Sequence, residues 1–249
     1  FQGHILKEMG GYHKTRSGIV GLSLKEIMAS SKDFSDLFLL ISLLNAQSIP
    51  RELLEKYKDP ISVADFIYHL NKYSLMMETP LAVLSLHHST QDIALPYLIQ
   101  HLAVTKDSPL LKTISNVLDD YMDHIIEEED FPKMKMMAGH LEIFLAHPEL
   151  LTDLSKGILT SKLGSLYYFI NDDRTRKTLA ESLEILRGQN LDHLSAEERS
   201  RLARSLVHVG AVYTELRLDQ EAKTLLEKAV DIYEKEKVRN YTDLSWALT

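Results

Sequence analysis

The chain of 249 residues contains no cysteine, so no disulfide can stabilise its fold. A protein without disulfides fits a reducing compartment, and we expect a cytoplasmic location. Glycine and proline are also scarce, with ten and seven residues, which disfavours a fold rich in turns. Leu, Lys, Glu, Met and Ala instead dominate the runs of the sequence, and these residues favour helix. We therefore predict a mainly α-helical fold.

Long apolar runs are missing as well. The run Leu37 to Ile41 is interrupted by Ser42, so it falls far short of the ~20 residues that span a bilayer. We expect no membrane segment. An excess of positive charge is also absent, because 36 acidic residues outnumber 28 basic ones and give a net charge of −8. Nucleic acid is not expected as a general partner, since binding it requires a basic face.

The sequence contains none of the common catalytic motifs. The phosphate-binding loop Gly-x-x-x-x-Gly-Lys-Ser/Thr is absent, as are His-Glu-x-x-His and Gly-x-Ser-x-Gly. The neighbours His87 and His88 would point to opposite faces of a strand, so they are poorly placed to share a metal ion. We predict no catalytic residue, no metal ligand and no cofactor in this chain. A hydrolase that uses His87 or His140 is a weaker alternative, because no nucleophile, base and orienting group can be aligned.

Acidic residues cluster at two places, Asp119-Asp120 and residues 127–130. Paired carboxylates can act in catalysis, but they need a pocket and a second structural element to hold a substrate. Runs of like charge more commonly lie at solvated helix ends. We interpret both runs as solvated helix ends.

Residues 31–104 show the order of elements in a winged-helix domain. Apolar periodicity predicts four helices, over residues 33–44, 50–57, 62–73 and 90–102. Between the third and the fourth, residues 75–77 and 82–86 have the pattern of two short strands around a turn. A winged-helix domain has this order, which is three helices, a small β-hairpin and one further helix.

Two segments of this region resemble NB-ARC (STAND-class) ATPases. Residues 40–54, Leu-Ile-Ser-Leu-Leu-Asn-Ala-Gln-Ser-Ile-Pro-Arg-Glu-Leu-Leu, resemble the first half of the winged-helix subdomain of that family. Residues 84–91, Leu-Ser-Leu-His-His-Ser-Thr-Gln, resemble the segment that follows its hairpin. In the family a histidine of this segment approaches the β-phosphate of bound ADP, and the matching position is His87. The arginine that usually follows is replaced by His88.

Two amphipathic helices with small residues at regular positions lie near the C-terminal end. Their apolar faces consist of Leu206, Val209, Gly210 and Tyr213, then Ala222, Leu226, Ala229 and Tyr233. The small residues predict that the two helices approach closely at Gly210. A weaker copy surrounds Gly164, with Thr175 and Ser182 where alanine is usual. This pattern resembles the tetratricopeptide repeat, a pair of helices that stacks on its neighbours.

The expected organisation therefore has five parts. They are a tag remnant (1–4), the tail of a preceding helical subdomain (5–30), the winged-helix domain (31–104), linking helices (105–158) and tetratricopeptide-like repeats (159–249). The last repeat begins near Tyr241 and is truncated. A truncated repeat exposes an apolar helix face, so a homodimer through the C-terminal end is a further expectation.

Stacked helical repeats form binding surfaces, and we expect these to bind a protein or peptide. The polar face of the first helix would carry recognition. The candidate residues are Arg204, Ser205, His208, Ala211, Val212 and Glu215.

The resemblance implies a non-catalytic regulatory module of an NB-ARC-type signalling ATPase. Its winged helix would close on an upstream nucleotide-binding domain of the same chain, and ADP or ATP would bind there in a longer natural protein. The alternative is a winged-helix transcriptional regulator that binds DNA. Its recognition helix, residues 62–73, would carry Lys72 as its one lysine or arginine, whereas DNA-reading helices usually show several polar and basic residues.

Overall fold

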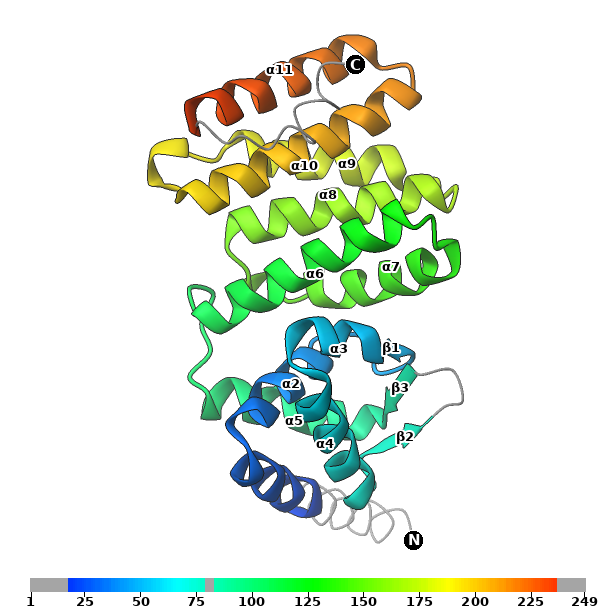
Figure 1. Ribbon diagram of the computed structural model, residues 1–249, viewed down its shortest axis with the longest axis vertical. Helices are drawn as coiled ribbons and strands as arrows, with labels where there is room; N and C mark the ends of the chain where they lie inside the picture. Colours follow the sequence, from blue (N-terminus) through cyan, green and yellow to red (C-terminus); the bar gives the residue numbers. More distant parts are fainter. Residues whose placement is uncertain (1–17, 79–82, 237–249) are drawn as a thin grey trace, which may run out of the picture. The chain divides into compact units, whose positions relative to one another are not determined.

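The computed structural model describes residues 18–78 and 83–236 (Figure 1). The described residues are mainly helical and include one small sheet, which confirms the predicted fold class at this level. Among the described helices, none combines the length and the apolar character that crossing a bilayer requires. The chain divides into two compact units, Phe1–Val117 and Leu118–Thr249. The predicted repeat at residues 241–249 lies outside the described residues.

The first unit combines helices with a three-stranded sheet. After a helix described over residues 18–30, its elements are α2 (Lys32–Ser42), β1 (Ile49–Pro50), α3 (Arg51–Tyr57), α4 (Pro60–Lys72), β2 (Met76–Glu78), β3 (Val83–Leu86) and α5 (His88–His101). The strands β2 and β3 pair antiparallel with Met76 opposite Leu86, so the predicted hairpin is confirmed. The strand β1 pairs antiparallel with the other edge of β3. It was not predicted, because two residues are too few to show alternation.

Capping residues fix where the helices of this unit begin. Ser31 caps α2, because its hydroxyl accepts a hydrogen bond from the backbone N–H of Asp33 at 3.3 Å. The carboxylate of Asp59 caps α4 by accepting from two backbone N–H groups of its first turn, at 3.1 and 3.0 Å. Pro60 follows at the first helical position, where its missing N–H costs nothing. This helix therefore starts two residues before the predicted position.

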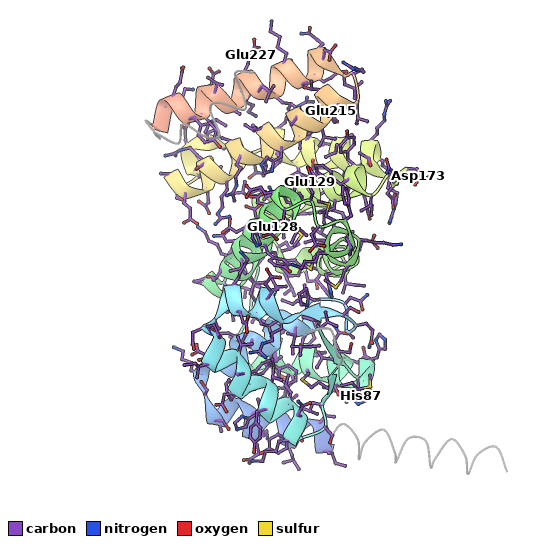
Figure 2. The ribbon with its side chains drawn as sticks, turned by 45° about the vertical axis from the view of Figure 1, so that its right-hand side comes forward. His87, Glu128, Glu129, Asp173, Glu215 and Glu227 are labelled. Carbon is purple, nitrogen blue, oxygen red and sulfur yellow. The ribbon has the colours of Figure 1, made fainter. Side chains whose placement is uncertain are left out.

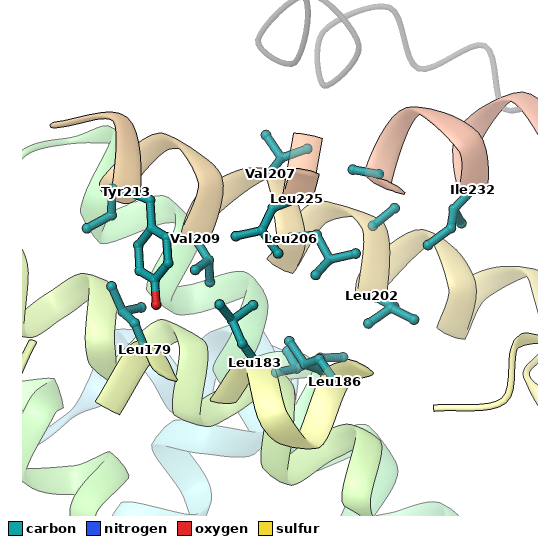
Figure 3. Close-up of a cluster of buried hydrophobic side chains, with 14 of the residues drawn as sticks. Leu179, Leu183, Leu186, Leu202, Leu206, Val207, Val209, Tyr213, Leu225 and Ile232 are labelled. Atoms are coloured by element: carbon teal, nitrogen blue, oxygen red, sulfur yellow. The ribbon is translucent and has the colours of Figure 1, made fainter. Parts of the chain in front are cut away.

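The second unit is built from paired helices. The helix α6 (Pro109–Glu127) crosses the division between the units, and the later helices are α7 (Phe131–Leu145), α8 (Asp153–Phe169), α9 (Thr175–Arg187), α10 (Ala196–Glu215) and α11 (Asp219–Glu236). Short 3-10 helices at Pro148–Leu150 and Leu191–His193 connect them. The helix α8 packs on α9, and α10 packs on α11; α7 and α10 also contact α8. Figure 3 shows the apolar side chains that α9, α10 and α11 contribute to this core.

The helix α10 begins with a capping box at Ser195. The Ser195 hydroxyl accepts from the backbone N–H of Glu198 at 3.3 Å. The Glu198 carboxylate accepts in return from the backbone N–H of Ser195 at 2.8 Å. Two backbone donors at the helix end are thereby satisfied.

Two glycines lie where paired helices approach most closely. A Cβ on Gly210 would lie 2.9 Å from Leu226 Cδ2, which confirms the predicted close approach. A Cβ on Gly164 would lie 2.5 Å from Leu179 Cδ2 and 3.2 Å from the Leu179 backbone nitrogen. The two glycines occupy the same place in successive helix pairs, because Leu179 matches Leu226 in the repeat pattern. Larger residues there would force the helices apart.

We predict that Gly164→Ala destabilises the protein by about 1–3 kcal/mol, because the added methyl meets both the side chain and the backbone of Leu179. Urea unfolding measures the change. The control is Gly139→Ala in α7, where a Cβ would meet nothing within 4 Å. Helix propensity alone predicts that this control gains up to ~1 kcal/mol. Equal losses in both variants would contradict the proposed close packing.

Candidate functional site

A group of charged side chains from α6, α8 and α10 forms a network of ion pairs in the second unit. We call it the ionic cluster, and its members are Asp119, Asp120, Asp123, Lys162, Arg201, Arg204 and His208. All seven residues belong to the second unit. The cluster therefore joins three helices that are far apart in sequence.

Lys162 lies at the centre of the cluster, and its side chain is 0% exposed. Its ammonium group donates a hydrogen bond to Asp123 Oδ1. It also lies 3.5 Å from Asp119 Oδ1 and 2.6 Å from His208 Nδ1. An ammonium group buried without a partner would cost several kcal/mol, so these neighbours are required for α8 to hold a lysine here.

Two arginines of α10 bind the aspartates from the other side. Arg201 Nη1 lies 2.8 Å from Asp119 Oδ2 and 2.9 Å from Asp120 Oδ1, and its Nη2 donates to Asp120 Oδ2 at 3.1 Å. Arg204 Nη2 donates to Asp119 Oδ2 at 2.6 Å and to Asp120 Oδ1 at 2.9 Å. Bonds between a guanidinium and a carboxylate are among the stronger hydrogen bonds in proteins. Both arginines therefore tie α10 to α6.

The three aspartates respond differently to the same surroundings. Burial alone would raise the pKa of Asp119, but Lys162, Arg204 and Arg201 hold it below its ordinary value. Burial is likewise outweighed at Asp120, where hydrogen bonds from the two arginines lower the pKa. Burial raises the pKa of Asp123, and the nearby Asp119 adds to the rise against the opposing effect of Lys162. Asp119 and Asp120 are thus the carboxylates that the cluster holds ionised.

His208 lies at the edge of the cluster with its side chain half-buried. Loss of hydration and the charge of Lys162 lower its pKa well below the ordinary value. A neutral ring can accept the hydrogen bond from Lys162 at Nδ1 and carry its proton on Nε2. His208 therefore contributes an acceptor to Lys162 without adding a further positive charge.

The aspartates of the cluster also have the spacing of metal ligands. One oxygen from each of the three lies within 4.8 Å of the others. These oxygens, however, face one lysine and two arginines at ion-pair distances. A divalent ion would have to displace these cations or lie against them, which Coulomb repulsion opposes. The residues present fit an internally neutralised cluster better than a metal site.

The structure brings together two of the six residues predicted to form the protein-binding face. Arg204 and His208 join the ionic cluster, where both already have partners. Ser205 and Val212 are buried, at 1% and 5% exposure, so they are corrected to core positions of α10. The remaining two, Ala211 and Glu215, are exposed. Helical periodicity placed these two residues wrongly, because α10 packs against both α8 and α11.

The acidic runs also need a correction. Asp119 is 1% exposed and faces α8 and α10, so it does not lie at a solvated helix end. The run at residues 127–130 agrees with the prediction, since Glu128 and Glu129 are exposed at the end of α6 (Figure 2). Sequence reasoning missed the partners Lys162 and Arg201. The sequence did contain one signal, the helical spacing of these residues. Asp119 and Asp123 are four apart, and Arg201 and Arg204 are three apart, so each pair lies on one face of its helix.

His87, the proposed nucleotide neighbour, lies in the first unit at the start of α5 (Figure 2). It is half-buried, and its backbone carbonyl accepts from the N–H groups of Thr90 and Gln91 at 2.8 and 3.1 Å. Within the described residues, its ring makes no hydrogen bond or ion pair.

Gln91, the last residue of the family-like segment, has a structural role. Its side-chain amide donates to the carbonyl of Ser42 at 3.0 Å and to the carbonyl of Leu44. The Ser42 carbonyl lies in the last turn of α2, where helical carbonyls lack intrahelical partners, and Leu44 follows two residues later. Gln91 therefore fixes α5 against the end of α2, which explains a glutamine at this position without any ligand.

Comparison with known proteins gives no further assignment, because no family model, curated protein or solved structure matches the chain. The resemblance to NB-ARC ATPases therefore rests on residues 40–54 and 84–91 and on the order of elements.

We predict that Gln91→Ala destabilises the first unit by about 1–3 kcal/mol, because two buried carbonyl groups lose their donor. Urea unfolding followed by circular dichroism measures the change. Gln100→Ala is the control, since Gln100 is exposed on the same helix. Equal stability of the two variants would contradict the structural role inferred for Gln91.

Lys162→Met should cost about 3–5 kcal/mol of unfolding free energy, because it leaves Asp119 and Asp123 without their buried cation. The control Lys177→Met removes an exposed lysine of α9 and should stay within about 0.5 kcal/mol of the wild type. Both are measured by urea unfolding. A Lys162→Met protein as stable as the wild type would show that the aspartates do not depend on this lysine.

The pKa of His208 predicts how stability changes with pH. The folded ring has a pKa well below its ordinary value, whereas the unfolded chain binds a proton near pH 6.5. Stability is therefore lost as the pH falls below about 6.5, by at most about 1.4 kcal/mol per pH unit.

Unfolding at pH 7.5 and 5.5 should show a smaller loss for His208→Gln than for the wild type. The other histidines and the carboxylates are common to both proteins, so they cancel to a first approximation. An equal loss in both would exclude His208 as the titrating group.

Proposed function

We propose that this chain is a non-catalytic protein-interaction and regulatory module, in which a winged helix is followed by tetratricopeptide-like repeats. The observation that carries the proposal is the repetition of one packing contact. Gly164 meets Leu179 between α8 and α9, and Gly210 meets Leu226 between α10 and α11. Stacked helix pairs of this kind form extended binding surfaces.

The first unit supports the winged-helix part of the proposal. Its order is helix, short strand, two helices, hairpin and helix, and its sheet has the order β1-β3-β2. The segments that resemble NB-ARC ATPases fall within this order, at the end of α2 and after β3. The proposed module would be the regulatory half of such an ATPase, with the nucleotide-binding domain upstream in a longer natural protein.

His87 is the residue through which the winged helix would sense nucleotide. Its ring is half-buried at the start of α5 and is not engaged by the described residues. Contact with the β-phosphate of ADP would favour the closed state. A protein ligand on the repeats would release it by binding the open state more tightly, since a ligand shifts an equilibrium only through differential affinity.

DNA binding remains the second candidate, and the surface of α4 disfavours it. Ile61 and Tyr68 are 82% and 62% exposed on this helix. Asp65 lies between them with its side chain 58% exposed, and Lys72 is an exposed lysine at the end of the helix. An apolar face that carries an acid would repel phosphates. Such a face fits contact with protein better than contact with a major groove.

ADP retention by the protein encoded by the full reading frame tests the proposal. Wild type purified without added nucleotide should retain ADP, and His87→Ala should lose it at least about tenfold faster, because one charge-assisted contact is worth 1.5–3 kcal/mol. His88→Ala is the control, since His88 is its exposed neighbour. Equal retention by all three proteins, or no phosphate-binding domain in the reading frame, would refute the switch.

Fluorescence anisotropy with labelled duplex DNA tests the second candidate, a DNA-binding transcriptional regulator. We expect no binding at micromolar protein in 50 mM salt. Binding that weakens when Lys72→Ala is introduced would favour the transcriptional regulator.

A further inference from the structure

Asp120 differs from the other aspartates of the ionic cluster in its exposure. Its side chain is 49% exposed, whereas Asp119 and Asp123 are 1% and 12% exposed. It nevertheless contacts both arginines, at 2.9 and 3.1 Å to Arg201 and 2.9 Å to Arg204. Ion pairs with an exposed partner contribute little to stability, because water screens them. Asp120 is therefore the member of the cluster that is most easily replaced.

The two guanidinium groups have a second anchor beneath Asp120. The buried Asp119 holds Arg201 at 2.8 Å and Arg204 at 2.6 Å through the same oxygen, Oδ2. Arg204 Nε also lies 3.3 Å from Asp123 Oδ2. Both arginines would thus keep their positions when Asp120 turns away. A site whose donors are already oriented binds without the cost of ordering them.

Turning Asp120 toward solvent would remove one carboxylate from both arginines. Arg204 would keep Asp119 and Asp123, and Arg201 would keep Asp119 and the exposed Glu197, which lies 3.4 Å from its Nε. Arg201 Nη2, which donates to Asp120 Oδ2, would then be open to another carboxylate. The side chains of Arg201 and Arg204 are 16% and 27% exposed, so an incoming group can reach them. Two guanidinium groups that already share the Asp120 carboxylate suit another planar carboxylate, which can accept two hydrogen bonds at once.

We propose that Arg201 and Arg204 are the binding site for a carboxylate of an acidic peptide segment, and that Asp120 occupies this site as an internal competitor. The proposal rests on the proposed function, because it names the chemistry of the ligand that the repeats bind. Exchange requires a side-chain rotation of Asp120, and the buried contacts of α6 stay intact. The carboxylate can belong to a glutamate or aspartate side chain or to a free C terminus.

Binding of labelled peptides to the intact chain tests the proposal. The probes are a fluorescein-labelled pentaglutamate with a free C terminus, the same peptide amidated at its C terminus, and a pentaglutamine with an amidated C terminus. Fluorescence anisotropy at low salt gives the dissociation constants. The variants are Asp120→Asn, Asp120→Asn combined with Arg201→Gln and Arg204→Gln, and Glu227→Gln. The last is the matched control, since it also removes one negative charge and Glu227 is 67% exposed on α11 (Figure 2).

Asp120→Asn should bind pentaglutamate about tenfold more tightly than the wild type, because the competitor is gone while both arginines remain. Glu227→Gln should change the affinity less than about twofold, since an exposed charge at a distance is screened. The gain should vanish in the combined variant and with pentaglutamine. If the free and amidated pentaglutamates bind equally well, the bound group is a side-chain carboxylate. If amidation abolishes binding, the bound group is the C-terminal carboxylate. Either outcome supports the site.

The proposal is overturned if Asp120→Asn binds pentaglutamate no more tightly than Glu227→Gln, or if the gain persists without the two arginines. A second measurement needs no variant. Saturating pentaglutamate should shift the guanidinium Nε–Hε NMR signals of Arg201 and Arg204 in the wild type, and unchanged signals would also overturn the site. Either failure leaves the ADP-retention result untouched, so the proposed function is judged separately.

Discussion

A buried ammonium group on α8 is the constraint on which the second unit depends. Lys162 is 0% exposed, so each helix that covers it must supply a compensating group. The helix α6 supplies Asp119 and Asp123, and α10 supplies a neutral His208. An ion pair of this kind is not the most stabilising way to fill a core, because apolar residues of similar size can do as well. We infer that its main contribution is specificity, because only one register of three helices satisfies it.

The same constraint bears on the proposed binding function. Tetratricopeptide-like repeats would present the first helix of each pair to a ligand, but α8 is buried along most of its length. The arginines of α10 reach across to α6 and close the polar face over Lys162. A ligand therefore meets a surface whose charges are already paired. Such a surface fits a ligand whose carboxylate replaces Asp120 on the two arginines better than a ligand that enters an open groove.

The parts of the fold that were predicted correctly are those set by local sequence. The β2–β3 hairpin and the close approach at Gly210 each depend on a few neighbouring residues. Helix starts were less accurate because a single hydrogen bond, such as that of Asp59, decides them. The β1 strand was missed because its two residues form a strand only by pairing with β3.

The candidate site was predicted only in part, for a physical reason. The sequence pointed to Arg204 and His208 as polar positions of one helix. Their partners lie 85 residues away at Asp119 and 46 residues away at Lys162. Helical periodicity gives the face on which a residue lies but not the helix that covers that face. For the same reason Asp119 was interpreted as solvated, since its sequence neighbourhood does not show that α8 and α10 cover it.

A double-mutant cycle between Lys162 and Asp123 tests the central claim most directly. It compares the unfolding free energies of the wild type, Lys162→Met, Asp123→Asn and the double variant. A buried, mutually dependent pair predicts a coupling energy above about 1 kcal/mol, so the double variant is more stable than the sum of the single losses implies. Losses that add within about 0.5 kcal/mol would contradict the claim that this buried charge organises the three helices.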